Sequence, residues 1–84
     1  RRLVLLFQPH RYTRTRDLFD DFVSVLSLID LPIILEVYSA GEKPIPHVDG
    51  SMLTNAVRLH GNKNAEFVSG LEEAKLKLFS ILKN

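Results

Sequence analysis

Apolar and polar positions divide the first thirty residues into a short strand, a polar stretch and an amphipathic helix. Residues 3–7 form an uninterrupted apolar run with β-branched and aromatic members, which predicts a strand buried on both faces. Further along, apolar residues recur at helical spacing with aspartates and serines between them: Leu18, Phe22, Leu26 and Ile29. The residues between strand and helix, 7–16, are therefore predicted to form a strand-to-helix loop.

A predicted strand followed by a predicted helix occurs twice more in the rest of the chain. Pro32 disfavours helical geometry in the residue before it, so a second strand is predicted over the apolar run 33–38. Residues 39–50 contain two glycines and two prolines and are predicted to be a long loop. Asp49 or Ser51 can then cap a helix that ends at Gly61.

A third strand and a final helix complete the pattern. Residues 65–68 predict a short strand, and Ser69 and Glu72 have the spacing of a capping box at the start of the last helix. The order is thus β-α-β-α-β-α, which implies a three-layer, Rossmann-like α/β fold with a parallel sheet and right-handed crossovers. Ligands of such sheets bind at the loops that follow the carboxyl ends of the strands.

Length indicates a single small domain or a part of one. The chain has 84 residues, of which 45% are hydrophobic and 25% charged. A chain of this size buries only about two thirds of its unfolded surface, so its own stability is expected to be marginal. Three strands are also few for a sheet buried on both faces. We therefore expect residues 1–84 to be one incomplete domain of a longer protein.

Composition narrows the possible partners. The net charge of +1 gives no overall attraction to nucleic acid or membranes, although the first sixteen residues are basic, and no apolar run approaches about 18 residues. The absence of cysteine excludes disulfides and thiolate chemistry and fits a reducing compartment. Neither a G-x-x-x-x-G-K-[ST] loop nor a G-x-G-x-x-G fingerprint occurs. The three histidines are far apart in the sequence, and no metal site is predicted.

Side chains that could bind a ligand or take part in a reaction are concentrated in the predicted loop 7–16. It contains a histidine, three arginines and a tyrosine, so it is rich in cationic hydrogen-bond donors and is expected to bind an anion. Thr13 or Thr15 could cap the following helix, whose free N–H groups also favour negative charge. Pro9 restricts the backbone where the strand ends.

Two interpretations of the charged residues stay open at this point. The arginines could instead form a solvated surface cluster that pairs with Asp17, Asp20 and Asp21, because surface ion pairs are common and individually weak. Glu36, near the end of the second strand, could accept hydrogen bonds from loop amides, or could pair with Arg11 or Arg14.

The loop FQPHRYTRT (residues 7–15) closely resembles the C-terminal domain of the Mur ligases, in the branch that acts on L-alanine. The segments RDLFDDF (16–22), LEVYSAGE (35–42) and PIP (44–46) resemble the same family in the same order. The resemblance covers roughly the first sixty residues well, and the last helix matches by pattern only. A nine-residue polar motif in a strand–loop–helix context is a specific signal.

This resemblance implies a bacterial, cytoplasmic enzyme of peptidoglycan synthesis with three domains. Such an enzyme joins L-alanine to UDP-N-acetylmuramic acid at the expense of ATP, through an acyl phosphate. In similar enzymes the N-terminal domain holds the UDP-sugar and the central domain holds ATP and magnesium. The C-terminal domain closes over both and brings the amino acid. Since the other domains are not in this sequence, the chain is expected to be inactive by itself.

The resemblance also suggests roles for individual residues. Arg14 would hold the alanine carboxylate, Arg11 would stabilise negative charge on the phosphate, and His10 would orient the substrate or a hydroxyl partner. From the residues themselves, Tyr12, through its hydroxyl, and Glu36 are further candidates for contact with the substrate. The alternative function is an interaction module that binds anions or nucleic acid through a cluster of arginines: Arg1, Arg2, Arg11, Arg14 and Arg16.

Overall fold

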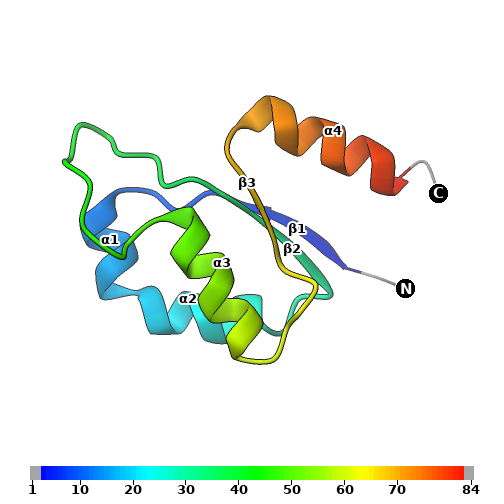
Figure 1. Cartoon of the computed structure of the whole chain (residues 1–84), viewed down its shortest axis with the longest axis horizontal. Helices are drawn as coiled ribbons and strands as arrows, with labels where there is room; N and C mark the ends of the chain where they lie inside the picture. Colours follow the sequence, from blue (N-terminus) through cyan, green and yellow to red (C-terminus); the bar gives the residue numbers. More distant parts are fainter. Residues whose placement is uncertain (1–2, 83–84) are drawn as a thin grey trace.

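The chain forms three layers around one small parallel sheet. The structure, a computed structural model, describes residues 3–82 apart from the side chain of Leu82. The sheet has the order β1-β2-β3, with strands β1 (Val4–Phe7), β2 (Leu31–Leu35) and β3 (Glu66–Val68). Four helices accompany it: α1 (Tyr12–Asp17), α2 (Phe19–Leu26), α3 (Gly50–Leu59) and α4 (Leu71–Leu82). Helices α2 and α3 cover one face and α4 the other (Figure 1), which confirms the predicted α/β fold.

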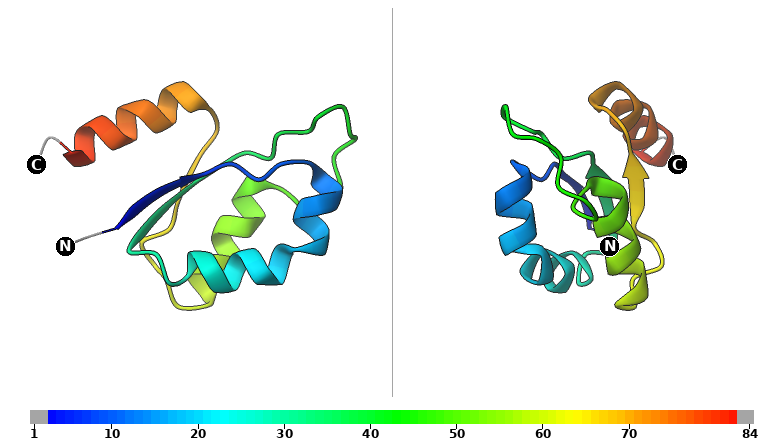
Figure 2. Two further views of the ribbon diagram at one scale, coloured as in Figure 1. Left: turned by 180° about the vertical axis from the view of Figure 1, so that it is seen from behind. Right: turned by 60° about the vertical axis from the view of Figure 1, so that its left-hand side comes forward.

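Alternation along the strands divides the core between the two faces. Ile34 packs with Val23 of α2 and with Leu53 and Val57 of α3. On the other face, Ile33, Leu35 and Val68 pack against Ala74 of α4. The two views of Figure 2 show α4 alone on its side of the sheet.

Burial on both faces was expected for the first two strands and holds only for the second. Residues 32–35 of β2 are buried, since β2 is the central strand and lies between both helical layers. In β1, Leu6 is 37% exposed, because α4 packs over β2 and β3 and leaves the outer part of β1 uncovered. No helix among residues 3–82 is long and apolar enough to cross a membrane.

The second strand begins and ends earlier than its apolar pattern predicted. Pro32 lies inside it, opposite Leu5 of β1, while β3 pairs only from Ile33 onward. The missing N–H of Pro32 therefore costs no bond to β3. Regular pairing stops before Glu36, and beyond it an isolated bridge joins Tyr38 to His10, in the segment that follows β1.

Two helices lie between β1 and β2, where one was predicted. Residues 12–16, assigned to the loop, form the helix α1 together with Asp17, and the chain bends at Leu18 before α2 begins. Only Thr15 of α1 is buried, so this helix has no apolar stripe that periodicity could detect. The prediction of a ten-residue loop was therefore wrong for the residues that form α1.

The ends of the other helices agree with the sequence in all but one detail. Asp49 caps α3 by accepting a hydrogen bond from the amide of Met52 at 2.7 Å, and Gly61 follows the helix with a φ of 125°. At α4, Ser69 donates to Glu73 and not to Glu72 as predicted, through its amide (3.1 Å) and its hydroxyl (2.8 Å). The helix begins at Leu71, so Glu73 is its third residue, the position whose side chain reaches back.

Candidate functional site

The predicted site residues lie where β1 and β2 end, at the edge of the sheet next to α1 (Figure 1). The amide of Tyr38 donates to the carbonyl of Pro9 at 2.9 Å, and the amide of Arg11 donates to the carbonyl of Tyr38 at 2.7 Å. The rings of His10 and Tyr38 are 5.1 Å apart between centroids. The exposed side chains of His10 and Arg11 are thus anchored by a rigid backbone connection between the two strands.

Arg11 has an unusual backbone conformation. Its φ of 70° and ψ of 142° lie in a region that residues with a side chain rarely adopt, at a cost of about 1–3 kcal/mol. The surrounding contacts hold it there. Its amide is bound to Tyr38, and its carbonyl accepts hydrogen bonds from the hydroxyl (2.7 Å) and the amide (3.1 Å) of Thr15. Such strain is often found at binding and catalytic residues.

Replacing Arg11 by glycine is expected to leave the stability of the protein nearly unchanged. Glycine relieves the strain at positive φ, and this gain offsets its larger entropy in the unfolded chain, so the free energy of unfolding should change by less than about 1 kcal/mol. Urea unfolding measures the change. A loss above about 2 kcal/mol would show that the side chain, and not the backbone conformation, stabilises this connection.

The first turn of α1 is bound by a carboxylate of the chain itself. The amide of Thr13 donates to Oε1 of Glu42 at 3.0 Å, and the hydroxyl of Thr13 donates to Oε2 at 2.8 Å. The prediction that Thr13 or Thr15 caps the helix was wrong, because Arg11 is the N-cap and Thr15 donates back to its carbonyl. The amide of Thr13, one of the N–H groups at the start of the helix, is therefore already used by a carboxylate of the chain.

The contact with Thr13 keeps Glu42 ionised. The amide of Thr13, followed by its hydroxyl, lowers the pKa of Glu42 below its ordinary value of 4.5. A lowered pKa means that the contact stabilises the fold above that ordinary value and is lost as the pH falls through the lowered one. In a ¹³C titration of the side-chain carboxyls, Glu42 should titrate below 4.5, and Thr13→Val should raise its pKa. An unchanged pKa in this variant would contradict the assignment.

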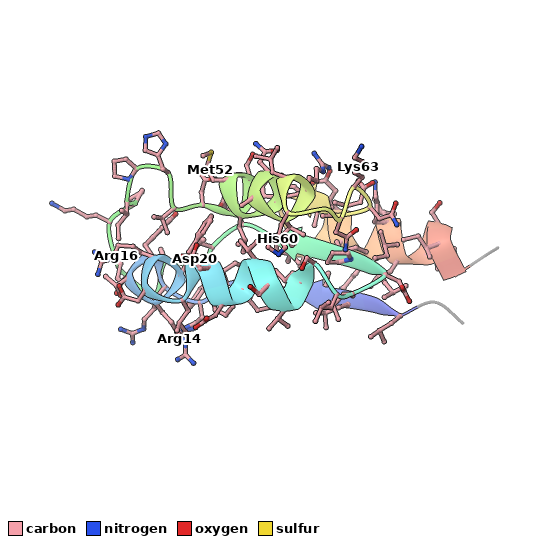
Figure 3. All side chains as sticks on the ribbon, turned by 90° about the horizontal axis from the view of Figure 1, so that it is seen from below. Arg14, Arg16, Asp20, Met52, His60 and Lys63 are labelled. Atoms are coloured by element: carbon pink, nitrogen blue, oxygen red, sulfur yellow. The ribbon has the colours of Figure 1, made fainter. Side chains whose placement is uncertain are left out.

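The three arginines of this region differ in their ionic partners. Arg16 pairs with the neighbouring Asp17 at 3.0 Å, with both side chains largely exposed. Arg11 lies close enough to Glu42 for its charge to contribute to the lowered pKa of that carboxyl. The side chain of Arg14 makes no hydrogen bond or ion pair with any residue that the structure describes, and it projects from α1 on the side away from α3 (Figure 3).

The surface-cluster interpretation therefore applies to Arg16 alone. Asp20 and Asp21 form no ion pair with an arginine within residues 3–82. The proposed nucleic-acid cluster also included Arg1 and Arg2, which lie outside the described residues. Within the described part, Arg14 is the arginine of α1 whose charge is available to a ligand.

Glu36 connects the end of β2 to the start of α3. Its Oε1 accepts hydrogen bonds from the amide of Val37 at 2.9 Å and from the amide of Gly50 at 2.7 Å. The interpretation that this carboxylate binds loop amides is confirmed, and the alternative pairing with Arg11 or Arg14 was wrong. Its contact with a substrate stays a prediction, as does that of the half-buried Tyr12.

Glu42 was not selected from the sequence as a site residue. A signal was available, since Glu42 ends the LEVYSAGE segment and follows a glycine. The structure places Ala40 and Gly41 at positive φ, in a turn closed by the amide of Glu42 and the carbonyl of Ser39 at 2.9 Å. This turn directs the carboxylate of Glu42 back toward α1.

Comparison with known proteins identifies close relatives. The chain is 57% identical over all 84 residues to the UDP-N-acetylmuramate--L-alanine ligase of Methylococcus capsulatus. It is 51% and 50% identical to the ligases of the same name from Janthinobacterium sp. and Herminiimonas arsenicoxydans, again over its whole length. The chain spans 17–18% of the length of these relatives. No family model matches it. The resemblance noted in the loop and the segments that follow it is confirmed.

Proposed function

Because the chain is homologous over its whole length to a segment of the Mur ligases named UDP-N-acetylmuramate--L-alanine ligase, we propose that it is part of the C-terminal, closing domain of such an enzyme. The complete enzyme joins L-alanine to UDP-N-acetylmuramic acid and consumes ATP. A carboxylate oxygen of the sugar nucleotide attacks the terminal phosphorus of ATP and ADP leaves. The amine of alanine then attacks the acyl phosphate, and inorganic phosphate leaves. The contribution of this chain is to bind and orient.

The observation that supports this role most is the unpaired guanidinium of Arg14. A carboxylate can accept two parallel hydrogen bonds from one guanidinium, which gives both affinity and orientation. Arg16 is already paired with Asp17, and Arg11 is near the negative charge of Glu42. Arg14 is therefore assigned to the carboxylate of alanine.

Arg11 and His10 are assigned to the reacting groups. An exposed guanidinium on a rigid, strained backbone suits a phosphate whose negative charge increases during transfer. His10, whose ring lies 5.1 Å from that of Tyr38 between centroids, would orient the substrate by a hydrogen bond. Closure of the domain over the substrates would exclude water, which otherwise hydrolyses the acyl phosphate.

The described residues differ in how well they suit the phosphates of ATP and the magnesium ion. The side chains of Arg11 and His10 carry hydrogen-bond donors, which suit phosphate oxygens. Within residues 3–82, no three carboxylate or histidine side chains come together as a candidate metal site. From the likeness of this chain to the Mur ligases, we assign magnesium and most of the ATP to the central domain of the ligase. Bound ATP supplies the phosphoryl group that activates the sugar carboxylate.

The proposal is tested by measuring phosphate release in the full-length ligase that contains this segment. Release should require ATP, UDP-N-acetylmuramic acid and L-alanine together, and a ligase that lacks residues 1–84 should release none. Phosphate release that does not depend on alanine, or that survives the deletion, would contradict the proposal. A gel shift with short DNA at low and high salt examines the alternative nucleic-acid module.

A further inference from the structure

Glu42 connects the loop after β2 to the helix that carries the candidate arginines. The residues in contact, Thr13 and Glu42, are 29 positions apart in the sequence. Both carboxylate oxygens are used, one by the amide and one by the hydroxyl of the same residue. A contact with two hydrogen bonds to one residue restrains the orientation of the helix as well as its distance from the loop.

The restrained residue lies between the two arginines assigned to the substrates. Arg11 is the N-cap of α1 and Arg14 is its third residue, so Thr13 is in the turn that joins them. This helix has six residues and its N-cap forms no side-chain hydrogen bond of its own. A helix this short is marginal without outside contacts. The orientation of Arg14 therefore depends on what holds the first turn of α1.

The loop that carries Glu42 is itself anchored to the end of β1. The backbone of Tyr38 is hydrogen-bonded to Pro9 and Arg11, and the turn from Ser39 to Glu42 follows directly. The loop from Tyr38 to Glu42 is thus hydrogen-bonded at one end to the segment after β1 and at the other end to α1. The segment from Arg11 to Arg14 is restrained at two points: Arg11 is bonded to Tyr38, and Thr13 is bonded to Glu42.

We propose that Glu42 is a positioning residue of the ligase: it binds Thr13 and so holds Arg11 and Arg14 in the orientation that receives the negative groups of the substrates. This inference rests on the proposed function. The proposal gives Glu42 no contact with the substrate, since each of its two oxygens accepts a hydrogen bond from Thr13 and its role is to hold α1. It also keeps substrate anions away from the helix start, so that they are directed to the guanidinium groups.

The inference is tested in the full-length ligase with Glu42→Ala, and with Glu42→Gln as a variant of nearly the same shape. A misplacement of about 1 Å can cost about 100-fold in rate, so Glu42→Ala should lower kcat/KM for L-alanine by about 10- to 100-fold. Glu42→Gln retains an oxygen for the amide of Thr13 and should lose less.

The domain contains a matched control for this substitution. Glu73 makes the same kind of contact at the start of α4, with the amide and the hydroxyl of Ser69. In both cases these hydrogen bonds lower the pKa of the carboxyl. Glu73→Ala should cost similar stability and leave kcat/KM for alanine within about twofold of the wild type. Equal losses of activity in both variants would show only a general structural effect and would overturn the inference.

A double-mutant cycle with Arg14 separates positioning from an independent role. Because Glu42 acts through Arg14 as well as through Arg11, Glu42→Ala should lower kcat/KM for alanine clearly less in the Arg14→Ala background than in the wild type. The role of Glu42 would be overturned if the double variant lost activity by the product of the two single losses, or if Glu42→Ala and Glu42→Gln had wild-type kinetics. Either result would leave the proposed function intact. A ligase in which even Arg14→Ala has wild-type kinetics would instead contradict the assignment of Arg14 in the proposed function.

Discussion

Replacing Arg14 by alanine in the full-length ligase is expected to lower kcat/KM for L-alanine by about 100-fold or more, mainly through a higher KM for this substrate. Each hydrogen bond to a charged group contributes about 1.5–3 kcal/mol, and a guanidinium can form two of them with one carboxylate. The fold should be unaffected, because the side chain of Arg14, which the substitution removes, makes no hydrogen bond or ion pair with the described residues. Steady-state kinetics with varied alanine measure the effect.

Arg16→Ala is the matched control for this prediction. Arg16 is on the same short helix and carries the same charge, but it is paired with Asp17 at the surface. Its removal should change kcat/KM for alanine by less than about twofold, as expected for a weak exposed ion pair. Equal losses from Arg14→Ala and Arg16→Ala would show that the general positive charge of α1 matters, and not a specific contact with the carboxylate.

Gly50→Ala is expected to be the most destabilising small substitution at the edge of the sheet. A Cβ at position 50 would lie 2.5 Å from the carbonyl oxygen of Leu35 and 2.8 Å from the ring of Phe67. The first of these is a backbone atom of the central strand, so the clash cannot be relieved by a side-chain rotation. We expect the free energy of local opening of β2 and α3, which is the quantity that hydrogen exchange measures, to fall by about 2–4 kcal/mol.

Hydrogen exchange of the β2 and α3 amides in the full-length ligase measures this loss locally. Gly70→Ala is the control, because a Cβ there meets no atom within 4 Å. That substitution should change the opening free energy by no more than about 1 kcal/mol. If Gly50→Ala changes the opening free energy as little as Gly70→Ala does, this result would contradict the close approach of α3 to β2.

The elements that the sequence predicted well are those with an apolar pattern. The strands and their order along the chain follow from short apolar runs separated by segments with helical spacing of apolar residues. The patterns of β2 and α3 are clear examples. Helix α1 could not be predicted in this way, because only Thr15 of its residues is buried. A polar helix of six residues has the same appearance in a sequence as a loop.

The candidate site was predictable in its location but not in its internal contacts. Parallel strands end at one edge, so the loops around His10 and Tyr38 had to be near each other. The contact between Glu42 and Thr13 depends on a turn with two residues at positive φ. The backbone of Arg11 is held by the hydrogen bond that it donates to Tyr38 and by those that it accepts from Thr15. Such contacts between distant segments leave no local signal in the sequence.

The central claim is that Arg14 recognises the carboxylate of the amino-acid substrate, and it is tested most directly by comparing L-alanine with L-alaninamide as acceptors. The amide retains the attacking amine and the methyl group but lacks the negative charge. We predict that the wild-type ligase prefers alanine by about 100-fold in kcat/KM and that Arg14→Ala loses nearly all of this preference. A preference that is undiminished in Arg14→Ala would contradict the claim.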